Sequence, residues 1–327
     1  MADTGTDPAT EARSYRRRRS SVRREGAGDR RPSSRRTVRR RRPGSGRPGR
    51  GEKRRARLRQ TVSIAILVLL GLAVLVVPPI VDLDQQQVVL RQADLPPSTD
   101  HPFGTDEVGR DVLLRCVYGL RVSFTVGIVA ALVATAIGVV VGAIAGAFGG
   151  WTDRILMRLV DTLASVPHLL LGIFIVAIFR PSLSAVIASI ALTHWLSTAR
   201  IVRSEILSLR ERPFVDAAIV GGATRWRIIR RHLLPNVAPQ ALLAATLMVP
   251  HAIWHETALS FLGLGLPAHL ASLGNMINDG QRSLLTGVWW TSFFPGLLVV
   301  VAALAIAGLA GHLRDRTDPQ RRAELML

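Results

Sequence analysis

The feature that most constrains this sequence is a run of apolar residues long enough to cross a lipid bilayer. Val62–Ile80 contains 19 residues and no charged side chain. As an α-helix it would rise about 28 Å, close to the thickness of the hydrocarbon core. Five further apolar stretches follow: Val122–Ala147, Ile155–Phe179, Ala185–Val202, Val237–Phe261 and Trp289–Leu313. The sequence therefore predicts an all-α, polytopic transmembrane helical bundle of about six spans.

A cleaved signal peptide is the alternative interpretation of the first stretch. The apolar region of a signal peptide is normally shorter, and no small-x-small cleavage site precedes Pro78-Pro79. We therefore interpret residues 61–81 as a retained first span.

Positive charge is concentrated before this span. Residues 1–60 hold 22 of the 42 Lys and Arg residues but only 6 of the 23 Asp and Glu residues. Because the segment is also rich in Gly, Pro and Ser and almost free of apolar side chains, we predict a disordered tail. Its arginine runs, such as Arg16–Arg19, are compatible with binding to nucleic acid or anionic lipid. We favour a solvated cytoplasmic tail that helps to orient the first span, with no nucleic-acid partner.

The distribution of arginine between the loops predicts the orientation of the bundle. With six spans both termini lie on one side, and the basic tail makes that side cytoplasmic. The loop 203–235, on the same side, carries seven arginines, whereas the loop 263–287, on the other side, carries only Arg282. We therefore predict a multi-pass cell-membrane protein with both termini in the cytoplasm. Its parts are an extracytoplasmic loop at 82–121, a transmembrane domain at 122–313 and a cytoplasmic tail at 314–327.

Glycine and proline residues within the spans predict how the helices pack. Three glycines recur every fourth residue and would allow the second span to approach another helix closely: Gly138, Gly142 and Gly146. Three prolines lie inside spans and are expected to kink them: Pro167, Pro250 and Pro295.

The cytoplasmic loop at 204–235 has the pattern of two short helices joined by a turn. Pro213 suits the first turn of a helix, where its missing N–H group is not needed. Gly221-Gly222 would end this helix, and Thr224 is a suitable N-cap for a second one. We expect the second helix to end before Pro235.

This loop resembles the coupling loop of ABC importer permeases, known as the EAA motif. The residues that carry the resemblance are Asp216, Ala217, Ala218 and Gly222, followed by Leu234 and Pro235. In that family the loop docks into a groove on the ATPase subunit and transmits its movement to the spans. The family pattern usually begins with Glu, whereas Asp216 keeps the charge on a shorter side chain. An ordinary amphipathic loop is the alternative, and the position between the fourth and fifth spans favours the coupling loop.

Further segments are similar to the dipeptide, oligopeptide and nickel permeases of this family. They occur in the family's order at 101–111, 118–123, 157–161, 259–265 and 294–296. Two features depart from the family: Leu273-Gly274 stands where Trp-Gly is common, and the long Arg-rich tail is unusual.

The resemblance implies a permease subunit of an ATP-binding-cassette importer that forms the translocation path for di- or oligopeptides. A nickel or other small-solute importer is the alternative. The implied partners are a homologous second permease subunit, one or two ATP-binding subunits, an extracytoplasmic solute-binding protein and membrane lipid. ATP and Mg²⁺ would bind to the partner ATPase. No cofactor is expected on this chain, because its only lysine, Lys53, precedes Arg54 and cannot complete a GxxxxGK[ST] phosphate-binding loop.

Four polar residues are candidates for the translocation path: Asp161, His251, His255 and Glu256. An ionisable side chain within a span needs a partner, and for Asp161 we favour Arg158 or the second permease. His251 and His255 are four residues apart and share a helical face, a spacing that a metal could use. Two histidines and one carboxylate are too few to specify a metal, so we predict packing or pore polarity and no metal site.

Two other classes of membrane protein have less support in the sequence. An ion-driven secondary transporter would show paired intramembrane charges and inverted repeats, and the sequence contains no convincing repeat. A membrane enzyme would have to use the polar residues of the fifth span. No Ser-His-Asp or Cys-His arrangement has the support of a motif, so we predict no catalytic residue.

Overall fold

The computed structural model describes residues 50–81, 88–179, 181–267 and 269–317, and the regular elements of these ranges are all helices. The predicted all-α fold is therefore confirmed. The longer helices are α2 (Arg50–Ile80), α3 (Val112–Phe148), α4 (Gly150–Ala164), α5 (His168–Phe179), α6 (Leu183–Arg210), α9 (Leu234–Phe261), α10 (Leu273–Ser283) and α11 (Trp290–Thr317). The shorter ones are η1 (Leu90–Gln92), α7 (Pro213–Val220), α8 (Arg225–Ile228), η2 (Ile229–Leu233) and η3 (Leu284–Thr286).

Five of the described helices are long and apolar enough to cross a membrane, and α4 with α5 supplies a sixth if the pair is counted as one span. This agrees with a polytopic bundle of about six spans. The kink predicted at Pro167 in the third span is confirmed, because α4 and α5 are bent by 85° at the residues between Ala164 and His168. Pro167 lies in this break, where its ring and its missing N–H group disfavour a continuous helix.

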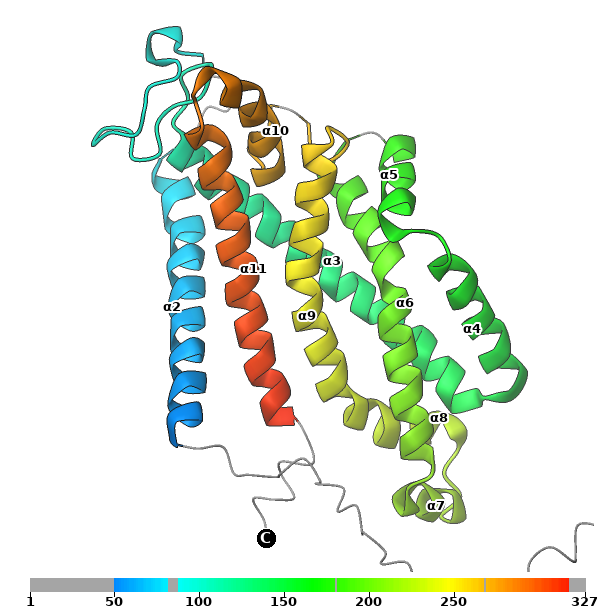
Figure 1. Cartoon of the computed structure of the whole chain (residues 1–327). Helices are drawn as coiled ribbons and strands as arrows, with labels where there is room; N and C mark the ends of the chain where they lie inside the picture. The colour runs from blue at the N-terminus through cyan, green and yellow to red at the C-terminus, as the bar shows by residue number, and fades with distance from the viewer. Residues whose placement is uncertain (1–49, 82–87, 180, 268, 318–327) are drawn as a thin grey trace, which may run out of the picture. The chain divides into compact units, whose positions relative to one another are not determined.

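Helix α3 lies at the centre of the bundle and packs against both α6 and α9 (Figure 1). The predicted close approach along the glycine stripe is present between α3 and α6. A Cβ atom placed on Gly138 would lie 2.6 Å from Cβ of Thr198, and one on Gly146 would lie 2.9 Å from Cγ2 of Ile206. Because both distances are shorter than van der Waals contact, these positions require glycine.

The bundle has two distinct ends. Helix α10 packs against α9 and α11 at one end, called here the α10 end, whereas α7 and α8 lie at the opposite end, called the α7 end (Figure 1). Helix α2 packs along α11. A buried apolar cluster near the α10 end joins α2, α3, α10 and α11 through residues that include Leu70, Cys116, Leu273 and Trp290.

Several helix boundaries differ from the sequence predictions, and the starts of α3 and α2 differ most. Helix α3 begins at Val112 rather than Val122, so the loop predicted at 82–121 ends earlier. The backbone N–H of Leu114 donates to Oδ1 of Asp111 at 2.9 Å, which caps the helix. Arg115 lies in the first turn of α3, and its charge is neutralised by Asp106.

The second difference concerns the basic tail. Helix α2 begins at Arg50, so residues 50–60 are helical although they were predicted to be disordered. Arg is a good helix former, and the apolar span that follows provides a helix for these residues to extend. Residues 1–49 and 318–327 lie outside the described residues, and with them most of the predicted tails.

The loop 263–287 was not predicted to be helical, yet it contains α10.

Candidate functional site

The predicted coupling loop forms two short helices, α7 and α8, called here the bracket (residues 213–233). Helix α7 starts at Pro213, as predicted from its position. Gly222 has a φ of 75°, a left-handed conformation that favours glycine and turns the chain. The backbone N–H of Arg227 then donates to Oγ1 of Thr224 at 3.3 Å, which confirms the predicted N-cap of the second helix.

The expected end of the second helix before Pro235 is wrong. The chain passes from α8 through the π-helical turn η2 directly into α9, and residues 225–261 form one membrane-length helix. The backbone N–H of Leu234 donates to the carbonyl of Ile229, five residues back. Such a wide turn accommodates Pro235 in the first turn of α9, where its missing N–H group is tolerated. The bracket is therefore continuous with the α9 span.

The inner side of the bracket is packed against α6. Buried residues from α7, α8, η2, α6 and α9 form a single apolar cluster that includes Val202, Ile206, Val215, Ile228 and Leu233. At the end of α6, Nη1 of Arg210 donates a 2.9 Å hydrogen bond to the carbonyl of Gly146 in α3. The bracket is thus attached to the helices of the bundle by apolar packing.

The outer side of the bracket is exposed and largely apolar. Asp216 and Ala217 are exposed, and Ala218 is half-buried beneath them. Three large apolar side chains of α7 are also exposed: Phe214, Ile219 and Val220, the last of which is 89% exposed. Exposed apolar surface of this kind, rimmed by polar residues, is typical of a protein-binding site.

Helix α4 is joined to α6 by two ion pairs. Asp161 accepts a 3.0 Å hydrogen bond from Nη2 of Arg200, so its partner is a residue of α6 rather than Arg158, the neighbour favoured from the sequence. The guanidinium of Arg203 binds both carboxylate oxygens of Asp153. Because Asp161 is 69% and Arg200 48% exposed, their pair lies on the surface of the chain.

The structure divides the polar residues predicted in the fifth span into two sites. His251 and His255 lie in α9 beside two histidines from other helices, His168 and His194. Glu256 is not part of this group. Its carboxylate is fully buried and accepts hydrogen bonds of 2.8–2.9 Å from three serine hydroxyls: Ser123 to Oε2, and Ser260 and Ser272 to Oε1.

The serine hydroxyls give Glu256 a structural role that its position in the sequence does not indicate. Ser123 belongs to α3, Ser260 to α9, and Ser272 is the N-cap of α10. One buried carboxylate therefore connects three helices. A buried carboxylate is stable only when hydrogen bonds replace its lost hydration, and these hydroxyls supply them.

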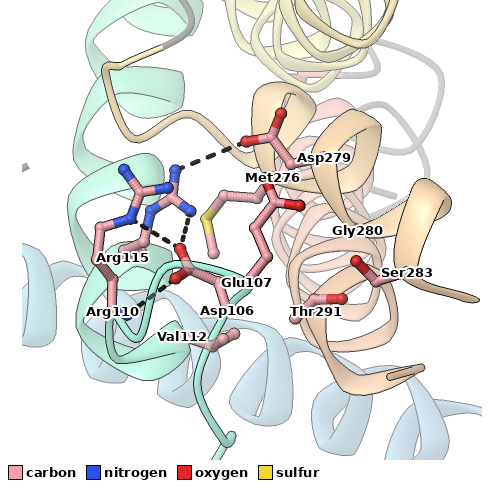
Figure 2. A pocket seen from close by; sticks show the side chains of 10 residues that line it. All are labelled: Asp106, Glu107, Arg110, Val112, Arg115, Met276, Asp279, Gly280, Ser283 and Thr291. Atoms are coloured by element: carbon pink, nitrogen blue, oxygen red, sulfur yellow. Dashed lines mark hydrogen bonds and ion pairs between the residues drawn. The ribbon is translucent and has the colours of Figure 1, made fainter. Parts of the chain in front are cut away.

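A further polar site lies near the α10 end, in the segment whose sequence resembles peptide permeases (Figure 2). Oδ2 of Asp106 accepts hydrogen bonds of 2.8 Å from Nε of Arg110 and 2.6 Å from Nη1 of Arg115. Nη2 of Arg115 lies 3.9 Å from Asp279 of α10, so the network connects this segment to that helix. Burial raises the pKa of Asp279 above its usual range, and the nearby Arg115 opposes the shift.

Backbone contacts also order this segment. The backbone N–H groups of Val108 and Arg110 donate to Oδ1 of Asp106, and Nε1 of Trp290 donates to the carbonyl of Thr105 at 3.0 Å. Nδ1 of His101 lies 2.8 Å from Oδ2 of Asp111. The motif at 101–111 therefore builds a rigid cap at the start of α3.

Sequence reasoning missed the residues that complete each of these sites. His168 and His194 were not singled out, although a histidine within a span is an unusual residue that could have been noticed. The three serines around Glu256 carry no such signal, because serine is common in packed transmembrane helices. The predicted residues Asp216, Ala217, Ala218, Gly222, Leu234 and Pro235 all lie in or directly after the bracket.

These features define a multi-pass α-helical membrane protein with a helical bracket at one end. Residues 138–319 match the family described as binding-protein-dependent transport system inner membrane component. The chain belongs to this family of ABC importer permeases, whose members are transport subunits rather than enzymes.

Curated relatives extend the similarity beyond the region matched by the family. The chain is 41% identical over 233 residues to the dipeptide transport system permease protein DppC of Bacillus subtilis, covering 71% of this chain and 73% of that protein. It is 40% identical over 261 residues to the oligopeptide transport system permease protein OppC of the same organism, covering 80% and 85%. A structure of the MetNI methionine ABC transporter in inward-facing conformations covers 63% of this chain and 97% of its own, with 21% identity and a TM-score of 0.48.

Proposed function

We propose that this chain is the permease subunit of an importer of di- or oligopeptides and that a separate ATPase drives it through the bracket. The relatives named for dipeptide and oligopeptide transport support the substrate class. The arginine distribution supports a cytoplasmic position for the α7 end and for both termini. The α10 end then faces the solute-binding protein outside the membrane.

The observation that carries the proposal is the exposed apolar side of α7. Phe214, Ile219 and Val220 project from the same short helix as Asp216 and Ala217. Ala217 is small, so another surface can approach the helix backbone closely there. Because the bracket is continuous with α9, displacement of α7 by a partner moves the end of a membrane span.

The partners follow from this division of labour. The ATPase consists of one or two ATP-binding subunits, which bind ATP and Mg²⁺. One of these subunits docks on the bracket. A homologous second permease completes the translocation path, and lipid covers the remaining apolar faces. Nucleic acid has no part in this mechanism.

Uptake of a radiolabelled dipeptide into cells tests the proposal. The host lacks its own peptide uptake and expresses this chain with the neighbouring genes for its partner subunits. Ala217→Arg should abolish uptake and co-purification of the ATPase while leaving membrane insertion normal, because residue 217 is exposed and an arginine there does not disturb the core. Ala217→Ser is the matched control and should retain uptake.

A second pair of variants tests the turn and the acidic residue. Gly222→Pro should also abolish uptake, since proline cannot adopt the φ of 75° found there. Asp216→Glu should retain uptake, because it keeps the charge. Normal uptake in Ala217→Arg and Gly222→Pro would remove the bracket as the coupling site. Uptake that continues after ATP depletion, with ion gradients intact, would contradict an ATP-driven importer.

A further inference from the structure

Four histidines from three helices meet within the bundle. His168 begins α5, His194 lies in α6, and His251 and His255 lie one turn apart in α9. Each offers one ring nitrogen, and these four nitrogens all lie within 4.8 Å of one another. This group, called here the histidine cluster, contains half of the eight histidines of the chain.

The orientation of His194 is fixed by its neighbours. Its Nδ1 atom lies 2.9 Å from the carbonyl of Ile190 and 2.7 Å from Oγ1 of Thr193. A carbonyl only accepts hydrogen bonds, so Nδ1 carries the proton and donates it. In the neutral ring the lone pair is then on Nε2, the arrangement found in metal-binding histidines whose second nitrogen is held by a backbone carbonyl.

The second ring nitrogen of His194 has no hydrogen-bond partner in the described part of the chain. Nε2 is buried and makes no hydrogen bond to any described residue. The whole His194 residue is 7% exposed. A buried acceptor without a hydrogen bond is unfavourable and is uncommon in folded proteins. Packing of the rings against one another, with centroids 4.6–6.0 Å apart, does not satisfy this atom.

The cluster is accessible from an open cavity. A cavity of about 330 Å³ is lined by three of the histidines and by residues of the break between α4 and α5: His168, His194, His251, Ser165, Val166 and Pro167. His168 and His251 are exposed, whereas His194 and His255 are buried behind them. An ion entering the cavity would therefore meet two accessible ligands and then two buried ones.

The charges around the cluster limit which ion could bind. No carboxylate belongs to the cluster, and the nearby Glu256 is occupied by its serines. Arg200 also lines the cavity, but its charge is paired with Asp161. Imidazole nitrogen suits cobalt, nickel, copper and zinc, whereas magnesium and calcium prefer oxygen ligands.

We infer that the histidine cluster is a binding site for a late first-row transition-metal ion, held by His168, His194, His251 and His255. Around a tetrahedral zinc with bonds of 2.0–2.1 Å, ligand nitrogens lie about 3.3 Å apart. The four nitrogens are now up to 4.8 Å apart. Rotation of the side chains, two of which are exposed, brings the nitrogens to the shorter distance. With two histidines the sequence did not support a metal site, and the two further imidazoles change that conclusion.

Metal binding by the purified full-length chain tests the inference directly. The protein is prepared in detergent with an affinity tag that contains no histidine, stripped with a chelator and equilibrated with Zn²⁺, Co²⁺, Ni²⁺ or Mg²⁺. After desalting, elemental analysis should find one Zn²⁺, Co²⁺ or Ni²⁺ per chain and no Mg²⁺. Bound Co²⁺ should also show the intense visible absorption of a tetrahedral site.

Variants assign the ion to the cluster. His194→Ala and His255→Ala should each weaken Zn²⁺ binding by at least about tenfold, since even the loss of an outer-shell partner weakens metal sites 10–100-fold. His232→Ala and His269→Ala, at histidines outside the cluster, are the controls and should bind as the wild type does. Elution as a single size-exclusion peak shows that each variant is folded.

Two results would overturn the site. One is a wild-type chain that retains no transition metal after desalting, which needs no variant to interpret. The other is unchanged Zn²⁺ binding in the double variant His194→Ala/His255→Ala. Neither result depends on peptide uptake or on the ATPase, so the proposed transport function stands or falls separately.

Discussion

The hydroxyl of Ser123 in α3 donates a 2.8 Å hydrogen bond to Oε2 of Glu256 in α9, across 133 residues of sequence. The other carboxylate oxygen of Glu256 accepts from Ser260 and Ser272, so the carboxylate joins α3, α9 and the start of α10. This contact places α10 against the two central spans and makes Glu256 a residue of the framework.

Removal of this carboxylate should therefore destabilise the bundle. Glu256→Ala leaves a cavity and three buried hydroxyls without their acceptor, with an expected loss of about 2–5 kcal/mol in the free energy of unfolding. Denaturant unfolding in detergent micelles, followed by tryptophan fluorescence, measures this loss. Glu107→Ala, at an exposed residue, is the control and should change stability by no more than about 0.5 kcal/mol. Equal stability of the two variants would contradict the framework role.

A side chain at Gly138 should separate α3 from α6. A Cβ atom there would lie 2.6 Å from Cβ of Thr198, so Gly138→Val is expected to cost about 1–3 kcal/mol through overpacking. Gly71→Val in α2 is a matched control, because no atom lies within 4 Å of a Cβ atom at that position. The midpoint of thermal unfolding in detergent should fall for Gly138→Val only. A similar fall in both variants would show that glycine at 138 is not needed for packing.

The charge network near the α10 end should depend on Asp106. Arg115 is only 4% exposed, so Asp106→Asn leaves a buried guanidinium without its main partner. The expected cost is about 3–5 kcal/mol in the free energy of unfolding. Asp100→Asn, at an exposed residue of the same segment, should have little effect. Denaturant unfolding of the purified variants gives both values, and a stable Asp106→Asn protein would mean that Asp279 alone compensates Arg115.

The two ion pairs between α4 and α6 should differ in strength. Asp161 and Arg200 are both largely exposed, so a double-mutant cycle with alanine should give about 0.2–1 kcal/mol. Arg203 binds both carboxylate oxygens of Asp153, and a bidentate pair of this kind should couple by on the order of 1 kcal/mol or more. Unfolding measurements on both cycles test the order. A stronger coupling for Asp161–Arg200 would reverse it.

The spans and the bracket were predictable from sequence because their determinants are local. Apolar length is dictated by the bilayer, and Pro213, Gly222 and Thr224 each act on the backbone of their own segment. The errors arose where a compensating contact or turn decides the outcome. Helix α3 begins at Val112 rather than at the predicted Val122, because Asp111 caps it there and Asp106 and Asp279 compensate the charge of Arg115. Pro235 was taken to end a helix that instead continues through a π-helical turn.

The polar sites inside the bundle were less predictable for the same reason. His251 and His255 are visible as a pair in one helix, whereas His168 and His194 reach them only because α5 and α6 fold back against α9. Glu256 follows His255 directly in the chain, yet the helix turns it toward Ser123 and Ser272. The three residues are neighbours in the sequence of α9, but in the folded bundle Glu256 belongs to a different site from the two histidines.

The central claim is that an ATPase binds to the outer side of α7, and cross-linking from residue 217 tests it most directly. Ala217→Cys is introduced together with Cys116→Ala, which removes the only natural cysteine. A reagent that joins cysteine to lysine is then applied to membranes containing the whole transporter, since this chain has a single lysine, Lys53, and offers few internal targets. Asp100→Cys, an exposed position in the segment near the α10 end, is the control.

The account predicts a cross-linked product between Ala217→Cys and the ATPase and none from Asp100→Cys. A product from Asp100→Cys alone, or an ATPase that co-purifies with the chain but never cross-links to residue 217, would contradict it.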